Sequence, residues 1–153
     1  MLLAACSPSV AEKEANEQAR ASAKAHNLLF EACLELQAVG NPDAMYDLDY
    51  GPIEGIIFQA EGLDGDLSLE VGAVVTGLAD LDIGLAELED DIGDAQRRVS
   101  QGLVLDAQGF RIDPEEFRRR LEAFDEQASK LKAEIDLACA GFAAPVDVPD
   151  LLE

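Results

Sequence analysis

The sequence has no tryptophan, and its aromatic residues make up only 5% of 153 positions. Basic residues are also few: 11 Lys and Arg stand against 32 Asp and Glu, which gives a formal net charge of -21. Negative charge of this size is repelled by nucleic acid and by anionic membrane surfaces, so we expect neither as a direct partner. Because aromatics are scarce, the 48% of hydrophobic residues must form a mainly aliphatic core.

Motifs for catalysis are also absent. The single histidine, His26, has no partners at metal-ligand spacing, and no Ser or Cys lies in a recognisable nucleophile motif. Asp64-Gly65-Asp66 begins like a calcium loop but lacks the later glycine and glutamate that such loops need. We therefore predict no catalytic residue, no metal site, no cofactor and no enzymatic activity. A site assembled from scattered carboxylates is the alternative that remains open.

No apolar run is long enough to cross a membrane, because acidic residues interrupt even the most apolar stretch, from Leu67 to Val99. Within that stretch the apolar residues repeat with heptad spacing, which predicts one long helix with a coiled-coil seam. The residues at the two core positions are Val71, Leu78, Leu85, Ile92 and Val99, and Leu67, Val74, Leu81, Leu88 and Ala95.

A second long helix is predicted over residues 114–140. Asp113 is a good N-cap, Pro114 suits the first helical position, and Gly141 follows the last turn. Folding the two helices into an antiparallel hairpin with Val99 against Phe117 places large residues opposite small ones in several layers. In that register the layers include Leu85 with Leu131 and Ile92 with Phe124.

A first helix is predicted from Val10 to Val39, with an apolar stripe only in its second half. That half is the natural cover for the open end of the hairpin, so we predict an all-α, three-helix bundle. This arrangement brings Cys33 near Cys139, either as a disulfide or as two buried free thiols. For residues 41–65 we predict a short helix or an extended patch, and for residues 102–112 we predict a small β-hairpin.

The basic residues are unevenly distributed. No Lys or Arg occurs between Lys24 and Arg97, and six arginines then follow within a short span. The hairpin would place all six at one end, as a candidate site for an acidic protein partner, a phosphate or an anionic surface. The alternative is local pairing with neighbouring acids. The arginines are Arg97, Arg98, Arg111, Arg118, Arg119 and Arg120.

The amino-terminal residues Leu3-Ala4-Ala5-Cys6 resemble the lipobox of bacterial lipoproteins. The resemblance implies that Cys6 is lipidated and that the folded body lies in the periplasm. Only five residues precede Cys6 and none is basic, whereas a secretory signal has a basic region and a longer apolar region. Two explanations remain open: the start codon is misplaced, or the match arose by chance.

These features divide the chain into a truncated signal with lipobox (1–6), a helical tether (7–27), a helical bundle (28–142) and an acidic tail (143–153). The expected function is that of a non-enzymatic envelope lipoprotein, a structural or adaptor module that binds a protein partner. It would meet the membrane only through its lipid. The alternative is a cytosolic acidic coiled-coil binding module or small chaperone. The oligomeric state stays open.

Overall fold

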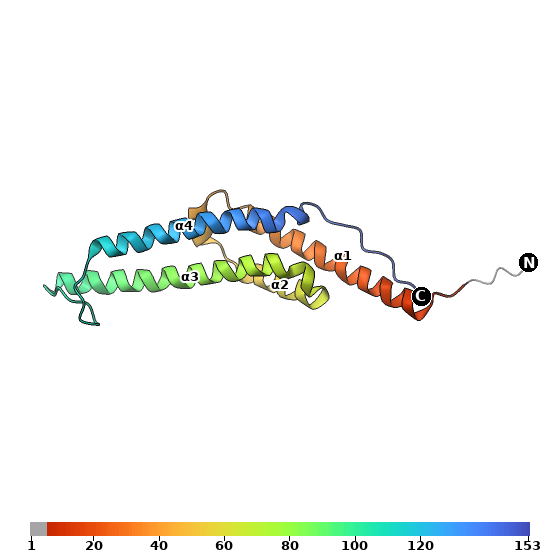
Figure 1. Ribbon diagram of the computed structural model, residues 1–153, viewed down its shortest axis with the longest axis horizontal. Coiled ribbons are helices and arrows are strands. Elements are labelled where there is room, and N and C mark those ends of the chain that lie inside the picture. Colours follow the sequence, from red (N-terminus) through yellow and green to blue (C-terminus); the bar gives the residue numbers. More distant parts are fainter. Residues whose placement is uncertain (1–5) are drawn as a thin grey trace, which may run out of the picture.

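The computed structural model describes residues 6–153, and the regular structure in that range is helical (Figure 1). The predicted all-α bundle is therefore confirmed. In chain order its elements are α1 (Val10–Gln37), the 3₁₀ helix η1 (Pro42–Asp47), α2 (Gly51–Leu63), α3 (Gly65–Ser100), α4 (Pro114–Cys139) and the 3₁₀ helix η2 (Ala140–Phe142).

Helices α3 and α4 form the predicted antiparallel hairpin, and they lie side by side along the molecule (Figure 1). Each begins at an aspartate whose side chain accepts a hydrogen bond from a free backbone amide of the first turn. Asp64 accepts from the N–H of Leu67, and Asp113 accepts from the N–H of Glu115. With 36 residues, α3 spans about 54 Å.

Glycines on α3 set the register of the hairpin. A Cβ atom added to Gly84 would lie 2.9 Å from Cε1 of Phe124, and one added to Gly77 would lie 3.1 Å from Cδ1 of Leu131. The large side chains of α4 therefore occupy spaces that α3 leaves open by having no side chain. An ion pair between Arg120 and Asp91 fits the same register, with Nη2 and Oδ2 3.1 Å apart.

The register predicted from the sequence is wrong by about two helical turns. It placed Leu131 against Leu85 and Phe124 against Ile92, whereas both side chains lie further toward the start of α3. Heptad counting considers only the apolar residues at the core positions and gives no weight to the spaces that glycines leave on the helix surface. One consequence is that Val99, a predicted core residue, is 56% exposed.

Helix α2 completes the bundle at the end opposite the α3–α4 connection. It packs on α1 and on α3, and its buried side chains are Ile53, Ile57 and Ala60. Residues 41–65, for which a short helix or an extended patch was predicted, therefore contain a helix. All four α-helices pack together at this end, while the far end of the molecule consists of the α3–α4 hairpin alone (Figure 1).

Cys33 lies next to Cys139 as predicted, and of the two alternatives the structure has the disulfide, with the two Cα atoms 5.6 Å apart. It links α1 to the last residue of α4 inside the main core. Leu29, Leu36 and Ile135 are fully buried in that core. The disulfide is therefore part of the buried core, where Cys33 and Cys139 are each 1% exposed.

The carboxyl-terminal tail, residues 143–153, leaves η2 and runs back beside the first half of α1 (Figure 1). Its end lies near the second turn of that helix, where the side chain of Asn16 forms hydrogen bonds with the main chain of Asp150 and Leu152. No sequence pattern predicted this contact, since we expected residues 7–27 to be a tether with little to pack against.

Candidate binding site at the hairpin tip

The hairpin tip, defined as residues 92–121, carries a concentration of exposed apolar side chains. It consists of the end of α3, the start of α4 and the connection between them. Val104 is 65% exposed and Phe110 is 71% exposed, and four other large apolar residues of the tip are also exposed. These four are Val99, Leu103, Leu105 and Leu121. Exposed apolar residues clustered at one place are typical of interaction sites.

An apolar groove of about 590 Å³ lies between the two helices of the tip. No third helix covers the hairpin at this point. The groove is therefore open, and the seam between α3 and α4 faces solvent. Its apolar lining comes from Ile92, Ala95, Val99, Ile112, Phe117 and Leu121. A groove of this size accommodates several apolar side chains of a partner.

The connection turns on itself beside the groove. Leu105 and Arg111 form a single antiparallel bridge, so the predicted β-hairpin is reduced to one bridged pair in the described residues. Asp106 holds the turn by accepting hydrogen bonds from the N–H groups of Gln108 and Phe110, and Gly109 has a φ of 88°. Only glycine adopts that angle readily.

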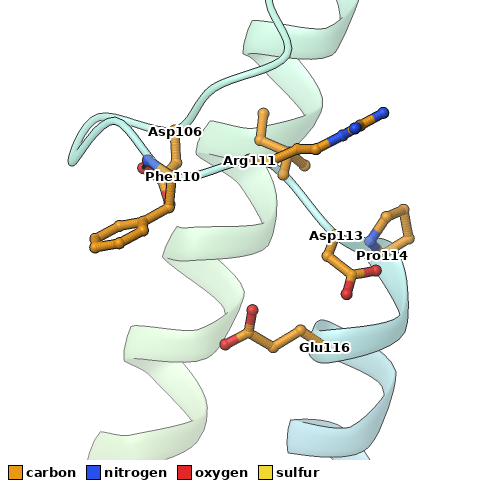
Figure 2. Close-up of a pocket in the computed structure, with 7 residues that line it drawn as sticks. Asp106, Phe110, Arg111, Asp113, Pro114 and Glu116 are labelled. Carbon is orange, nitrogen blue, oxygen red and sulfur yellow. Dashed lines mark hydrogen bonds between the residues drawn. The ribbon is translucent and has the colours of Figure 1, made fainter.

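A second hollow, of about 870 Å³, lies between this turn and the start of α4 (Figure 2). The side chains of Phe110 and Arg111 point in different directions from the connection, while Asp113 and Glu116 belong to the start of α4. Asp113 caps α4 and Asp106 holds the turn. Two of the carboxylates that line this hollow therefore have structural roles.

All six predicted arginines lie at the tip, but five of them are paired with nearby acids. The pairs are Arg97 and Arg98 with Asp94, Arg118 with Glu115, Arg119 with Asp113, and Arg120 with Asp91. Within residues 6–153, Arg111 makes no ion pair. Local pairing, the alternative considered for these residues, therefore accounts for most of the group.

These ion pairs are largely exposed, and pairs of this kind contribute only about 0–1 kcal/mol each to stability. Hydrogen bonding from Arg97 lowers the pKa of Asp94, with a further contribution from Arg98. Because each pair is worth little, a carboxylate of a partner can replace a local acid at small cost. The arginines thus suit the rim of a binding surface whose centre is apolar.

The sequence identified the arginines but missed the apolar groove. The run Leu103-Val104-Leu105 and Phe110 were visible in the sequence, where they predicted strands of a small hairpin. Their exposure depends on the length of the α3–α4 hairpin beyond the bundle. Nothing in a local sequence window reports which part of a helix pair remains uncovered.

Cys6 is exposed and has a free thiol. It lies just before the N-cap of α1, where the Ser9 hydroxyl and the Glu12 carboxylate form a capping box. The other lipobox-like residues, Leu3, Ala4 and Ala5, lie outside the described residues. None of the helices that the structure describes is both long enough and apolar enough to span a bilayer.

No protein-family model, curated protein or solved structure matched this chain. The evidence for its function therefore lies in its own residues and geometry. Three features are available for that purpose: the exposed Cys6, the disulfide, and the apolar tip with its rim of arginines.

Proposed function

We propose that this protein is a non-enzymatic adaptor of the bacterial envelope, anchored through a lipid on Cys6, which binds a partner protein with its hairpin tip. The observation that carries the proposal is the exposed apolar surface at the tip. Val104 and Phe110 project from the end of a helical hairpin whose body is otherwise strongly acidic. A surface of this kind is costly to leave in water and is stabilised when a partner covers it.

The remaining features support the envelope location. Cys6 is exposed ahead of the folded body, as a lipid attachment site requires. A disulfide between Cys33 and Cys139 suits an oxidising compartment such as the periplasm. The acidic body repels an anionic bilayer, so the lipid would hold the protein at the membrane while the body stays away from it.

Site-specific photocrosslinking tests the role of the tip. A photoreactive phenylalanine analogue replaces Phe110, and in a matched control it replaces Phe58, which is exposed on α2. We expect a discrete crosslinked protein from position 110 and not from position 58. Absence of any crosslink at position 110, or the same products from both positions, contradicts the proposal.

Intact-mass analysis of the protein from native membranes tests the anchor. We expect a diacylglycerol adduct that a Cys6→Ala variant lacks. We also expect the mass to be lower by the two hydrogen atoms that are lost when Cys33 and Cys139 form a disulfide. A native protein with an unmodified Cys6 and with reduced Cys33 and Cys139 would instead indicate the cytosolic binding module.

A further inference from the structure

The tail binds to α1 through paired hydrogen bonds to its main chain. Nδ2 of Asn27 donates to the carbonyl oxygen of Val146 over 2.9 Å, and Oδ1 of Asn27 accepts from the N–H of Val146 over 2.8 Å. One side-chain amide thus satisfies both main-chain groups of one extended residue. A neighbouring β-strand satisfies a peptide in the same manner.

A second pair of bonds lies about three helical turns earlier on α1, and it joins one asparagine to two different residues of the tail. Nδ2 of Asn16 donates to the carbonyl oxygen of Asp150 over 2.9 Å, and Oδ1 of Asn16 accepts from the N–H of Leu152 over 3.1 Å. Between the two asparagines, Arg20 donates to the carbonyl oxygen of Pro149. All of these bonds go to main-chain atoms of the tail.

The side chains of the tail, residues 143–153, are exposed apart from that of Val148, which is half-buried. Val146, Leu151 and Leu152 are all exposed, so the face of α1 contacts the backbone of an extended segment and leaves these side chains free. A site that binds main-chain atoms tolerates many sequences. Its selectivity must come from another property of the segment.

Charge supplies that selectivity. Lys13, Arg20 and Lys24 on α1 are the only basic residues in the first 96 positions, and the segment bound along this helix carries Asp147, Asp150 and Glu153. Three of the eleven basic residues thus lie on the helix that binds this acidic segment, together with Glu12, Glu14 and Glu17 of the same helix. The site therefore favours extended segments that are negatively charged.

We propose that the face of α1 that bears Asn16, Arg20 and Asn27 is a binding site for acidic, extended peptide segments, and that such a segment of a partner protein displaces the tail. The tail is suited to leave, because residues 143–147 are exposed and follow the buried anchor Phe142. A partner is favoured over a second copy of the chain, since two bodies with a net charge of -21 repel each other.

Proline substitutions in the full-length chain test this proposal without altering α1. Val146→Pro removes the N–H group that donates to Asn27, and Leu152→Pro removes the N–H group that donates to Asn16. The probe is a fluorescent peptide of residues 144–153, and its anisotropy reports binding. We expect this double variant to bind the peptide at least about tenfold more tightly than the wild-type chain, whose own tail competes at high effective concentration.

Side-chain amide signals of Asn16 and Asn27 in ¹⁵N NMR spectra report whether the tail has left.

The matched control is Leu151→Pro, since the N–H of Leu151 takes part in none of these bonds, and it should behave as wild type. Adding Asn16→Ala and Asn27→Ala to the double variant should abolish binding. A peptide with its three acids replaced by lysine should also fail to bind.

Several results would overturn the proposal. One is that the tail leaves α1 in the double proline variant but the peptide does not bind. Another is that the peptide still binds after both asparagines are replaced by alanine. Unchanged asparagine signals in the double variant would show that these bonds do not hold the tail. Dimers formed by exchange of tails, with no binding of free peptide, would assign the site to a second copy instead of a partner.

Discussion

The disulfide between Cys33 and Cys139 joins α1 to the last residue of α4, across 106 positions of the chain. The loop it closes contains η1, α2, α3 and nearly all of α4. Almost every element of the bundle is therefore restrained by one covalent bond, which limits the freedom of the unfolded chain.

Reduction of this disulfide should lower the free energy of unfolding by about 4–5 kcal/mol in the chain-entropy description of cross-links. Urea denaturation followed by circular dichroism, with and without dithiothreitol, measures the change. Cys6→Ser is the matched control, because Cys6 lies outside the bundle and its loss should leave both transitions unchanged. Equal midpoints for the oxidised and reduced wild-type protein would count against a stabilising role.

The contact between Gly84 and Phe124 gives a second prediction. Alanine in a helix interior is favoured over glycine by about 1 kcal/mol, but a Cβ at Gly84 would meet the ring of Phe124 at 2.9 Å. At Gly93 on the same helix the space around the added Cβ is open. We expect Gly93→Ala to raise the free energy of unfolding. The free energy of unfolding of Gly84→Ala should be at least about 1 kcal/mol lower than that of Gly93→Ala, because the ring of Phe124 must move.

Thermal unfolding of both glycine variants measures this difference. If the two substitutions stabilise equally, Phe124 does not pack on Gly84 and the register described for the hairpin is incorrect. The same comparison in a Phe124→Ala background provides the control, since the penalty at position 84 should then disappear.

The sequence predicted the helices well because their signals are local. Heptad spacing from Leu67 to Val99 and the capping residues Asp113 and Pro114 each report on a few neighbouring turns of chain. The proximity of Cys33 and Cys139 followed from packing α1 on the open end of the hairpin. That prediction required only the order and approximate lengths of the helices.

The register, the groove and the bound tail depend on non-local relations that local patterns do not contain. Gly77 and Gly84 determine the register through the spaces they leave for side chains of another helix. Asn16 and Asn27 occur in a stretch of good helix formers, where they resemble ordinary surface residues. Their role emerges only once the tail lies against α1.

The two tyrosines should ionise at unusually high pH. Tyr46 donates a hydrogen bond to Asp125 on α4, and burial together with the charge of Asp125 raises the pKa of Tyr46 from 10.0 to about 12. Burial and a hydrogen bond to Asp82 also raise the pKa of Tyr50. Because the folded protein favours neutral phenols, this stabilisation is complete below pH 10 and is lost as the pH rises through the raised pKa values.

Absorbance at 295 nm during an alkaline titration measures these ionisations. In a Tyr50→Phe variant we expect a single transition near pH 12 from Tyr46. Asp125→Asn should lower that pKa only partly, because burial is its largest cause. Asp82→Asn is the control and should leave Tyr46 unchanged; a transition at pH 10 in the folded Tyr50→Phe protein would contradict this assignment.

Asp64, the N-cap of α3, forms a hydrogen bond with Ser22 of α1. We expect this bond to raise the free energy of unfolding only when the carboxylate of Asp64 is ionised. Its carboxylate accepts a hydrogen bond from the Ser22 hydroxyl over 2.6 Å, and that bond is the largest cause lowering the pKa of Asp64 below 3.8. Since the folded pKa is the lower one, the stabilisation is present above about pH 4 and is lost as the pH falls through the depressed pKa. Carboxyl-carbon NMR measures the pKa of Asp64, which should rise toward 3.8 in Ser22→Ala. Ser100→Ala, at the distant hairpin tip, should not change it, and the assignment fails if Ser22→Ala has no effect either.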